Sequence, residues 1–221
     1  MIPKTSELFD LSHTLASSLL CECEYPWEAL PKIKDFILSI AEELPTELYY
    51  KLGDDVWIAK SAKIAPSALI CGPTIIGENT EVRHCAYIRG CALIGNDAVV
   101  GNSTEIKNAI IFDGVQIPHY NYVGDSILGY KSHMGAGSVT SNVKSDKTLV
   151  CVKNGGERIE TGRKKVGAML GDFVEIGCNS VLCPGSVIGR NTTVYPTSCV
   201  RGCIPADSIY KKDGVTVKKN I

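Results

Sequence analysis

Three residues of this sequence have side chains and spacings that suggest chemistry, namely Arg89, Lys107 and His119. Arg89 and Lys107 are 18 residues apart, and each directly follows an isoleucine. Two cations held side by side repel each other unless an anion lies between them, and a phosphate group is an anion that both bind well. A histidine titrates near neutral pH, so His119 could remove a proton from a nucleophile at such a site. These residue types therefore predict a site for a phosphorylated substrate.

Each of these residues also has a plainer interpretation. The two cations could extend into solvent, or they could pair with Glu105 or Asp125. A single histidine is more often structural than catalytic. On spacing alone, both interpretations stay open.

A six-residue repeat is the element that must position these side chains. Aliphatic residues recur at a spacing of six from Ile58 to Ile106, and after a slip of one residue the series continues from Ile111 to Val123. A second slip leads to Leu128, and the series resumes after an interruption from Leu170 to Val200. Neither a helix nor an alternating strand has this period. A hexapeptide repeat indicates a parallel β-helix, in which each unit is one short strand and a corner.

The repeat also predicts which side chains are neighbours. Three hexads make one coil, so residues 18 apart stack on the same face about 4.8 Å apart. Arg89 and Lys107 should therefore lie next to each other. By the same reasoning His119 should stack on Asn102, with His84 one coil further away. A small residue lies four places after each of the first eight aliphatics, where it lets the chain turn tightly.

The repeat divides the chain into three regions. Residues 1–52 form a helical N-terminal segment, since one helix face carries the apolar residues Leu30, Ile33, Phe36, Ile37, Ile40 and Leu44. Pro31 suits the first turn of this helix, and Pro45 suits the residue after its end. We expect the segment to be a docking unit outside the catalytic site. Residues 53–205 form the β-helix, with five coils to about residue 141 and two from residue 170, and residues 206–221 form a polar, solvated tail.

An insertion at residues 143–165 interrupts the β-helix. Its strands are predicted at 149–152 and 158–160, joined by the hairpin signal Asn154-Gly155-Gly156. Long loops on rigid scaffolds are often functional, although a decorative surface arm is the alternative.

Composition limits the functional classes. The formal net charge is −1, which implies no general attraction to nucleic acid or to an anionic membrane. The chain begins without a basic-then-apolar leader, and no apolar run approaches the roughly 18 residues needed to span a bilayer. We expect a cytoplasmic protein. The ten cysteines lack paired CxxC spacing, so we expect them to be reduced and to hold no metal, with those in the repeat acting as small buried residues.

Local strings within the repeat resemble a known family. They are EIKNAIIF, the HxxYxGD string from His119 to Asp125, and the GAGxxxxN string from Gly135 to Asn142. Over residues 53–205 the chain resembles the left-handed β-helix acyltransferases, and in particular the acetyltransferase half of bifunctional N-acetylglucosamine-1-phosphate uridyltransferase/glucosamine-1-phosphate acetyltransferase. The resemblance implies an all-β, left-handed parallel β-helix with a short helical N-terminal segment and a hairpin insertion.

The resemblance also implies a function and an assembly. The implied protein is an acetyl-CoA-dependent acetyltransferase acting on an amino-sugar phosphate, similar to glucosamine 1-phosphate, or on a related nucleotide sugar. Residues 1–50 contain no Gly-rich nucleotide loop, so we expect no nucleotidyltransferase activity. Three chains pack around an axis in this family, with active sites between neighbours. We therefore expect a homotrimer in which residues 144–165 reach a neighbouring chain's site.

The resemblance assigns roles to individual residues. His119 matches the catalytic base. The positions that match substrate contacts are Arg89, Lys107, Tyr122, His133 and Asn142. At His133 the family usually has an asparagine, so the identity of the sugar stays open. The positions that match contacts to CoA are Ala136, Cys178 and Pro196, with Lys211 as a further candidate for a CoA phosphate.

Two functions from other classes remain as alternatives. The first is a non-catalytic scaffold or regulatory subunit of a sugar nucleotidyltransferase. The second is a gamma-type carbonic anhydrase, which shares the β-helix and binds zinc through three histidines. The coils contain His84, His119 and His133, but two coils separate His84 from His119 by roughly 10 Å, too far to share one metal within a single chain.

Overall fold

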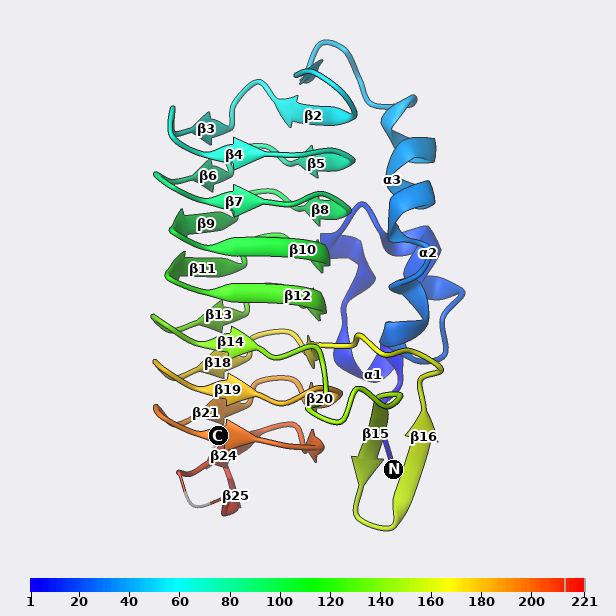
Figure 1. Ribbon diagram of the computed structural model, residues 1–221, viewed down its shortest axis with the longest axis vertical. Helices are drawn as coiled ribbons and strands as arrows, with labels where there is room; N and C mark the ends of the chain where they lie inside the picture. The colour runs from blue at the N-terminus through cyan, green and yellow to red at the C-terminus, as the bar shows by residue number, and fades with distance from the viewer. Residues whose placement is uncertain (213, 221) are drawn as a thin grey trace.

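A computed structural model describes residues 1–212 and 214–220 and has the form of a parallel β-helix (Figure 1). Its strands lie on three faces. The first face carries β2 (Val56–Ala59), β5 (Thr74–Ile76), β8 (Ala92–Ile94), the second half of β10 (Glu105–Ile111), the second half of β12 (Tyr122–Leu128), β17 (Ala168–Leu170), β20 (Ser186–Ile188) and β23 (Cys203–Ile204). The second face carries β3 (Lys63–Ile64), β6 (Glu81–Val82), β9 (Val99–Asn102), β11 (Gln116–His119), β13 (His133–Met134), β18 (Glu175–Ile176), β21 (Thr193–Val194) and β24 (Ser208–Tyr210). The third face carries β4 (Leu69–Ile70), β7 (Tyr87–Ile88), the first halves of β10 and β12, β14 (Val139–Thr140), β19 (Val181–Leu182) and β22 (Cys199–Val200).

The aliphatic residues of the repeat fill the interior. Ile58, Ile76 and Ile94 stack in register on the first face, and none of them is exposed. Ile88 pairs with Ile106 on the third face at the predicted spacing of 18. The described strands make five complete coils before the insertion and two after it. The parallel β-helix and its stacking are therefore confirmed, whereas the handedness of the coil stays a prediction.

The two slips in the repeat mark two tight corners between the third and first faces. Three residues separate Ile88 from Ala92 at this corner, whereas only two separate Ile106 from Ala109. As a result β10 and β12 each run through the corner as one continuous strand and pair with each other across it. These corners carry residues whose side chains line the cavity described below.

The N-terminal segment covers the first face. It contains α1 (Thr5–Leu8), η1 (Leu11–His13), α2 (Ser17–Cys21), η2 (Pro26–Ala29) and α3 (Ile33–Ala41), and β1 (Tyr49–Lys51) then pairs with β2. Helix α3 contacts β5, β8 and β10 (Figure 1). Outward residues of this face are fully buried beneath the segment, among them Ile75, Leu93, Ile110, Ile127 and Met169.

This packing corrects one expectation and confirms another. The predicted helix is present, and its residues Ile33 and Ile37 are buried. The segment is not a separable docking unit. It covers the outward side of the first face, whose other side already faces the interior of the β-helix, so residues of the segment belong to the hydrophobic core.

The insertion is the predicted hairpin. Strands β15 (Cys151–Asn154) and β16 (Glu157–Glu160) are antiparallel and flank Gly155 and Gly156. The first strand therefore lies two residues later than the predicted 149–152, and Asn154 belongs to it because it pairs with Glu157 rather than lying in the turn. Val150 and Val152 are fully buried. The hairpin approaches the late coils of its own chain so closely that a Cβ atom at Gly202 would lie 2.8 Å from the carbonyl oxygen of Lys153. The contact of the hairpin with a neighbouring chain's site stays a prediction.

Two smaller expectations are wrong. The start of the tail is not solvated, because β24 pairs with β21, and β25 (Thr216–Lys218) then pairs with β24; residues 213 and 221 of the predicted tail lie outside the described residues. Three cysteines of the repeat, Cys85, Cys178 and Cys199, are exposed rather than buried. Within the described residues, no helix has the length and apolar character needed to cross a bilayer.

Candidate active site

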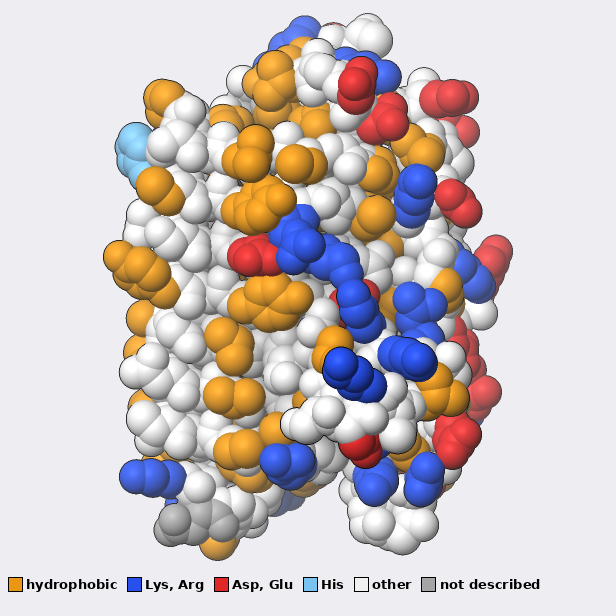
Figure 2. Space-filling model, viewed as in Figure 1, with side chains coloured by type: hydrophobic (Ala, Val, Ile, Leu, Met, Phe, Trp, Pro, Cys, Tyr) orange, Lys and Arg blue, Asp and Glu red, His pale blue; other side chains and the backbone are white. Residues whose placement is uncertain are grey.

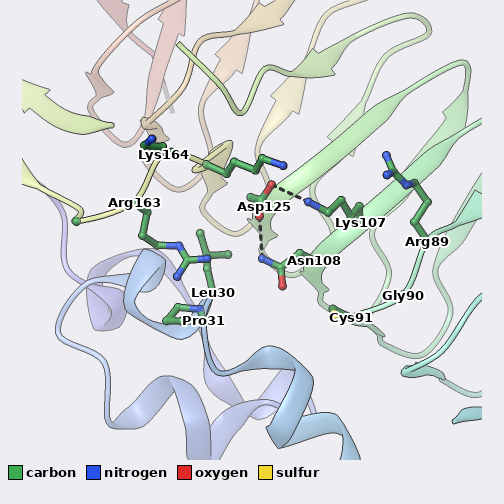
Figure 3. Close-up of a pocket in the computed structure, with 12 residues that line it drawn as sticks. Leu30, Pro31, Arg89, Gly90, Cys91, Lys107, Asn108, Asp125, Arg163 and Lys164 are labelled. Carbon is green, nitrogen blue, oxygen red and sulfur yellow. Dashed lines mark hydrogen bonds and ion pairs between the residues drawn. The ribbon is translucent and has the colours of Figure 1, made fainter. Parts of the chain in front are cut away.

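A cavity of about 600 Å³ lies at the corner where the third face meets the first (Figure 3). Three parts of the chain surround it. The β-helix contributes Arg89, Lys107, Asn108 and Asp125, the N-terminal segment contributes Leu30 and Pro31, and the segment after the hairpin contributes Gly162, Arg163, Lys164 and Lys165. Figure 2 shows Lys and Arg side chains gathered across this part of the surface.

Arg89 and Lys107 are neighbours, as their spacing predicts. The backbone amide of Arg89 donates a hydrogen bond of 2.8 Å to the carbonyl of Ile106, which places the two cations on adjacent strands. Each cation has a carboxylate partner. The Nη1 atom of Arg89 lies 2.7 Å from Oε1 of Glu105, and Nζ of Lys107 lies 3.7 Å from Oδ2 of Asp125. The pairing with Glu105 and Asp125, which spacing left open, is thus present.

Asp125 is the centre of the hydrogen bonds in this site. Its carboxylate is buried and accepts hydrogen bonds from Nδ2 of Asn108 at 2.9 Å and from Nδ2 of Asn142 at 2.6 Å. Its backbone adopts a φ of 48° at the tight corner, a conformation that Asp and Asn tolerate better than most residues. Sequence reasoning placed Asp125 in a motif and named it as a partner for a cation, but did not identify this central role.

Tyr122 and Asn142 lie beside Asp125. Asn142 Nδ2 donates a hydrogen bond of 3.1 Å to the hydroxyl of Tyr122. Gly124 makes room for both, since a Cβ atom there would lie 2.4 Å from the Tyr122 hydroxyl and 2.8 Å from Asn142 Nδ2. Burial raises the pKa of Tyr122 above its ordinary value, so the hydroxyl stays protonated at neutral pH and can donate to a bound molecule.

His119 lies at the edge of the third face that is opposite the cavity, where the second face ends. It ends β11, stacks on Asn102 as predicted, and is exposed. Among the described residues its imidazole has no hydrogen bond and no ion pair, although its carbonyl accepts a hydrogen bond from the amide of Gly137. The strand segment between the two edges is about three residues, or roughly 10 Å, wide. His119 and the cationic cavity therefore share one face but are not in contact.

The residues predicted to contact CoA follow His119 along the same corner. The amide of Asn179 donates to the carbonyl of Ala136, and the amide of Thr197 donates to the carbonyl of Cys178, which places His119, Ala136, Cys178 and Pro196 in one column. Lys211 directly follows β24, one coil beyond Tyr195. These contacts establish the column, and its contact with CoA stays a prediction.

His133 is not brought to the cavity within one chain. It lies on the second face, where Nδ1 is 2.8 Å from Oε2 of Glu175. No group of three or more His, Cys, Asp or Glu side chains within residues 1–212 and 214–220 is placed to hold a metal ion. A carbonic anhydrase site would therefore need histidines from several chains.

Sequence reasoning missed two parts of the cavity wall. The first is Leu30 and Pro31, which were expected to lie outside the site. The second is the run of three cations at Arg163, Lys164 and Lys165. The charge run itself was visible in the sequence, but its place beside Arg89 and Lys107 depends on the path of the hairpin.

Known proteins resemble this chain to different extents. A family model described as the GMPPB C-terminal domain matches residues 70–204. A bifunctional sugar-1-phosphate nucleotidylyltransferase/acetyltransferase of Sulfurisphaera tokodaii is 36% identical over 107 residues, which are 48% of this chain and 27% of that protein. The bifunctional protein GlmU of Methanococcus maripaludis is 37% identical over 116 residues, which are 52% of this chain and 28% of that protein.

A third relative matches over most of its length. The putative uncharacterized acetyltransferase YaiX of Escherichia coli is 31% identical over 173 residues, which are 78% of this chain and 74% of that protein. By contrast, the chain covers less than a third of the two bifunctional relatives.

Proposed function

The chain belongs to the GMPPB C-terminal domain family and to the hexapeptide-repeat acetyltransferases, and from this premise we propose that it transfers an acetyl group from acetyl-CoA to an amino-sugar phosphate. The observation that carries the proposal is the cationic cavity, which opens on the same β-helix face that His119 borders. Cations suit the phosphate of such an acceptor, and the name of the Sulfurisphaera relative includes both a sugar 1-phosphate and an acetyltransferase.

In the proposed mechanism, the cavity holds the acceptor and His119 acts as the base. Arg89 and Lys107 donate hydrogen bonds to the phosphate, and the Tyr122 hydroxyl donates to a sugar oxygen. His119 takes a proton from the sugar amine as the nitrogen attacks the thioester carbonyl, and the proton then passes to the departing thiolate of CoA. Most of the acceleration comes from alignment of donor and acceptor.

One backbone amide is available for the developing oxyanion. The amide of Gly135 already donates to the carbonyl of Ile176, and that of Gly137 donates to the carbonyl of His119. The amide of Ala136, between them, has no partner among the described residues. We assign the oxyanion contact to this amide, because a preorganised donor at the reacting carbonyl lowers the barrier.

The column that continues from His119 suits the pantetheine arm of the donor. Cys178 and Pro196 are exposed, and the side chains of the column are small. The amide of Cys178 has no partner among the described residues, so it is free to bond to a carbonyl group of such an arm. Lys211 is the proposed contact for a CoA phosphate.

We also propose that the protein is a homotrimer that uses the third face for contact between chains. The N-terminal segment covers the first face, and the second face carries polar residues such as Glu81, Gln116 and His133. The third face exposes a column in which Leu69, Tyr87 and Val181 are apolar and Glu105 is the one acidic position among the described residues (Figure 2). A neighbouring chain on this face would supply the partner that the His119 imidazole lacks in its own chain.

The test is a screen of amino-sugar phosphates with acetyl-CoA, in which release of the CoA thiol is measured. Turnover of glucosamine 1-phosphate or a close analogue is the expected result. The matched acceptor without phosphate should react far more slowly, since it cannot use the cations of the cavity. Absence of thiol release with every phosphorylated amino sugar would exclude the proposed reaction.

A non-catalytic regulatory role is the second candidate. It is favoured by the absence of a partner for the His119 imidazole among the described residues, where the one side-chain contact of His119 is made by its backbone amide, which donates to Oδ1 of Asn121. Titration with acetyl-CoA separates the two candidates, because a scaffold has no need to bind it. Stoichiometric zinc or iron in the purified protein would instead point to the carbonic anhydrase alternative.

A further inference from the structure

The positive charge of the cavity is unevenly distributed between its walls. On the β-helix wall, Arg89 pairs with Glu105 and Lys107 pairs with Asp125, so that wall has two cations and two carboxylates. On the opposite wall, the segment after the hairpin carries three cations, Arg163, Lys164 and Lys165. Within residues 1–212 and 214–220, none of these three lies in an ion pair. The excess charge that attracts an anion therefore comes from the hairpin side.

We propose that Arg163, Lys164 and Lys165, here called the return segment, are the principal phosphate-binding group of the cavity. The ligand class is a phosphate monoester, which is a dianion at neutral pH. The proposal rests on the proposed function, and it assigns the main binding role to residues outside the Arg89–Lys107 pair. Since the return segment lies against its own chain's cavity, it acts in that chain's site.

The backbone of the return segment is fixed by the residues of the site. The backbone of Lys165 forms an isolated antiparallel β-bridge with that of Val143. The amide of Val166 donates a hydrogen bond of 3.0 Å to the carbonyl of Asn142. The amide of Gly167 donates to the carbonyl of Asp125 at 2.7 Å. A side chain at Gly167 would prevent this approach, as its Cβ atom would lie 2.2 Å from the carbonyl oxygen of Gly124. A preordered segment pays less conformational entropy when it binds a ligand.

Arg163 provides a further observation that points to a ligand. Its side chain extends from the return segment toward Leu30 and Pro31, two apolar residues that offer no side-chain acceptor (Figure 3). The Nε atom is buried and has no hydrogen-bond partner. A buried donor without a partner is unfavourable, and an anion in the cavity would supply acceptors to the guanidinium group.

Two reactants of the proposed function carry a phosphate monoester. One is the amino-sugar phosphate, and the other is CoA through its 3′-phosphate. The same cations would recognise either, so the experiment uses both as probes. Glucosamine and dephospho-CoA are the matched probes that lack the monoester.

The test compares two double variants by calorimetry on the full chain. Lys164→Gln/Lys165→Gln removes two charges from the return segment. Lys147→Gln/Lys153→Gln removes two charges from the same insertion, at exposed positions outside this cavity. Thermal unfolding confirms that both variants are folded. Arg163→Gln, measured in parallel, keeps a polar but shorter side chain and loses the charge.

Binding of glucosamine 1-phosphate should weaken by roughly ten- to a hundredfold in Lys164→Gln/Lys165→Gln, because charge-assisted hydrogen bonds are lost. Glucosamine binding should not change, and the Lys147→Gln/Lys153→Gln variant should match the wild type. A selective loss for CoA over dephospho-CoA would also support the return segment as a phosphate site and would identify the donor as the source. Unchanged affinity for both phosphorylated probes, or an equal loss in the control variant, would overturn the proposal.

Failure of the proposed function gives a different result. If the chain binds glucosamine 1-phosphate through the return segment but transfers no acetyl group to any acceptor, the phosphate site stands and the reaction does not. If the wild type binds neither glucosamine 1-phosphate nor CoA, the return segment is not a phosphate site.

Discussion

Asn142 donates a hydrogen bond of 2.6 Å to the buried carboxylate of Asp125 and so joins two coils of the β-helix at the cavity. The same amide group reaches the Tyr122 hydroxyl at 3.1 Å. Asp125 in turn lies 3.7 Å from Nζ of Lys107. The buried carboxylate of Asp125 therefore orients two groups of the candidate site, the side-chain amide of Asn142 and the ammonium group of Lys107.

Replacing Asp125 with alanine should loosen this arrangement. The change leaves Nδ2 of Asn108 without its acceptor and leaves Asn142 with the Tyr122 hydroxyl alone, and the loss of a partner costs a buried group about 1–3 kcal/mol. The free energy of unfolding, measured in urea, should fall by about this amount. Asp54→Ala, at an exposed position, is the control. Equal stability of the two variants would contradict the central role of Asp125.

Replacing His119 with alanine should affect turnover and spare binding. Loss of a general base lowers kcat by roughly 10²- to 10⁴-fold, while the phosphate-binding cations are unaffected. His84 lies two coils away in the same corner column, where Asn102 contacts its carbonyl, so His84→Ala is the matched control. Steady-state kinetics with both variants provide the measurement. A wild-type kcat in His119→Ala would show that this histidine is structural.

The N-terminal segment should be required for stability. Ile37 is fully buried between α3 and the β-helix, and replacing a buried isoleucine with alanine costs about 2–5 kcal/mol. Urea unfolding of Ile37→Ala should show this loss, whereas Ser39→Ala, on the exposed side of the same helix, should remain close to the wild type. A small effect at Ile37 would mean that the segment docks only loosely.

Thiol alkylation should show where acetyl-CoA binds. Exposed Cys178 lies in the proposed CoA column, whereas exposed Cys85 lies several coils away. Both should react with a maleimide, and acetyl-CoA should protect Cys178 only. Burial raises the pKa of Cys203 to about 12, and because the thiolate is the reactive form, this thiol should stay unmodified at pH 8. Mass spectrometry of the labelled peptides measures all three, and equal labelling of Cys178 with and without acetyl-CoA would exclude this groove.

The assembly should depend on the third face. Light scattering should give three chain masses for the wild type. Placing a charge at an apolar position of the exposed column, as in Leu69→Asp or Val181→Asp, should shift the protein to smaller species, because an unpaired charge would be buried between chains. Leu15→Asp changes an exposed apolar residue of the N-terminal segment and should leave the mass unchanged. A stable, fully active wild-type monomer would remove the trimer proposal.

Much of the fold was predictable because the hexapeptide repeat is a local pattern with a direct geometric consequence. An aliphatic residue at every sixth position needs an interior to fill, and stacking at a spacing of 18 is enough to make Arg89 and Lys107 neighbours. The role of the first face was harder to predict. Residues such as Ile75, Leu93 and Ile110 are apolar on the outward side and are buried in the structure, and the spacing of the repeat does not say which segment covers them.

The sequence by itself determined the β-helix, the adjacency of Arg89 and Lys107, the place of His119 in its column and the presence of the hairpin. Tertiary structure alone decided that Glu105 and Asp125 balance the two cations and that Arg163, Lys164 and Lys165 line the other side of the cavity. The physical reason is that register follows from a repeating period, whereas the direction of a non-repetitive insertion follows from packing. The hairpin follows the path that buries Val150 and Val152 against its own late coils, and that burial sets where the return segment meets the site.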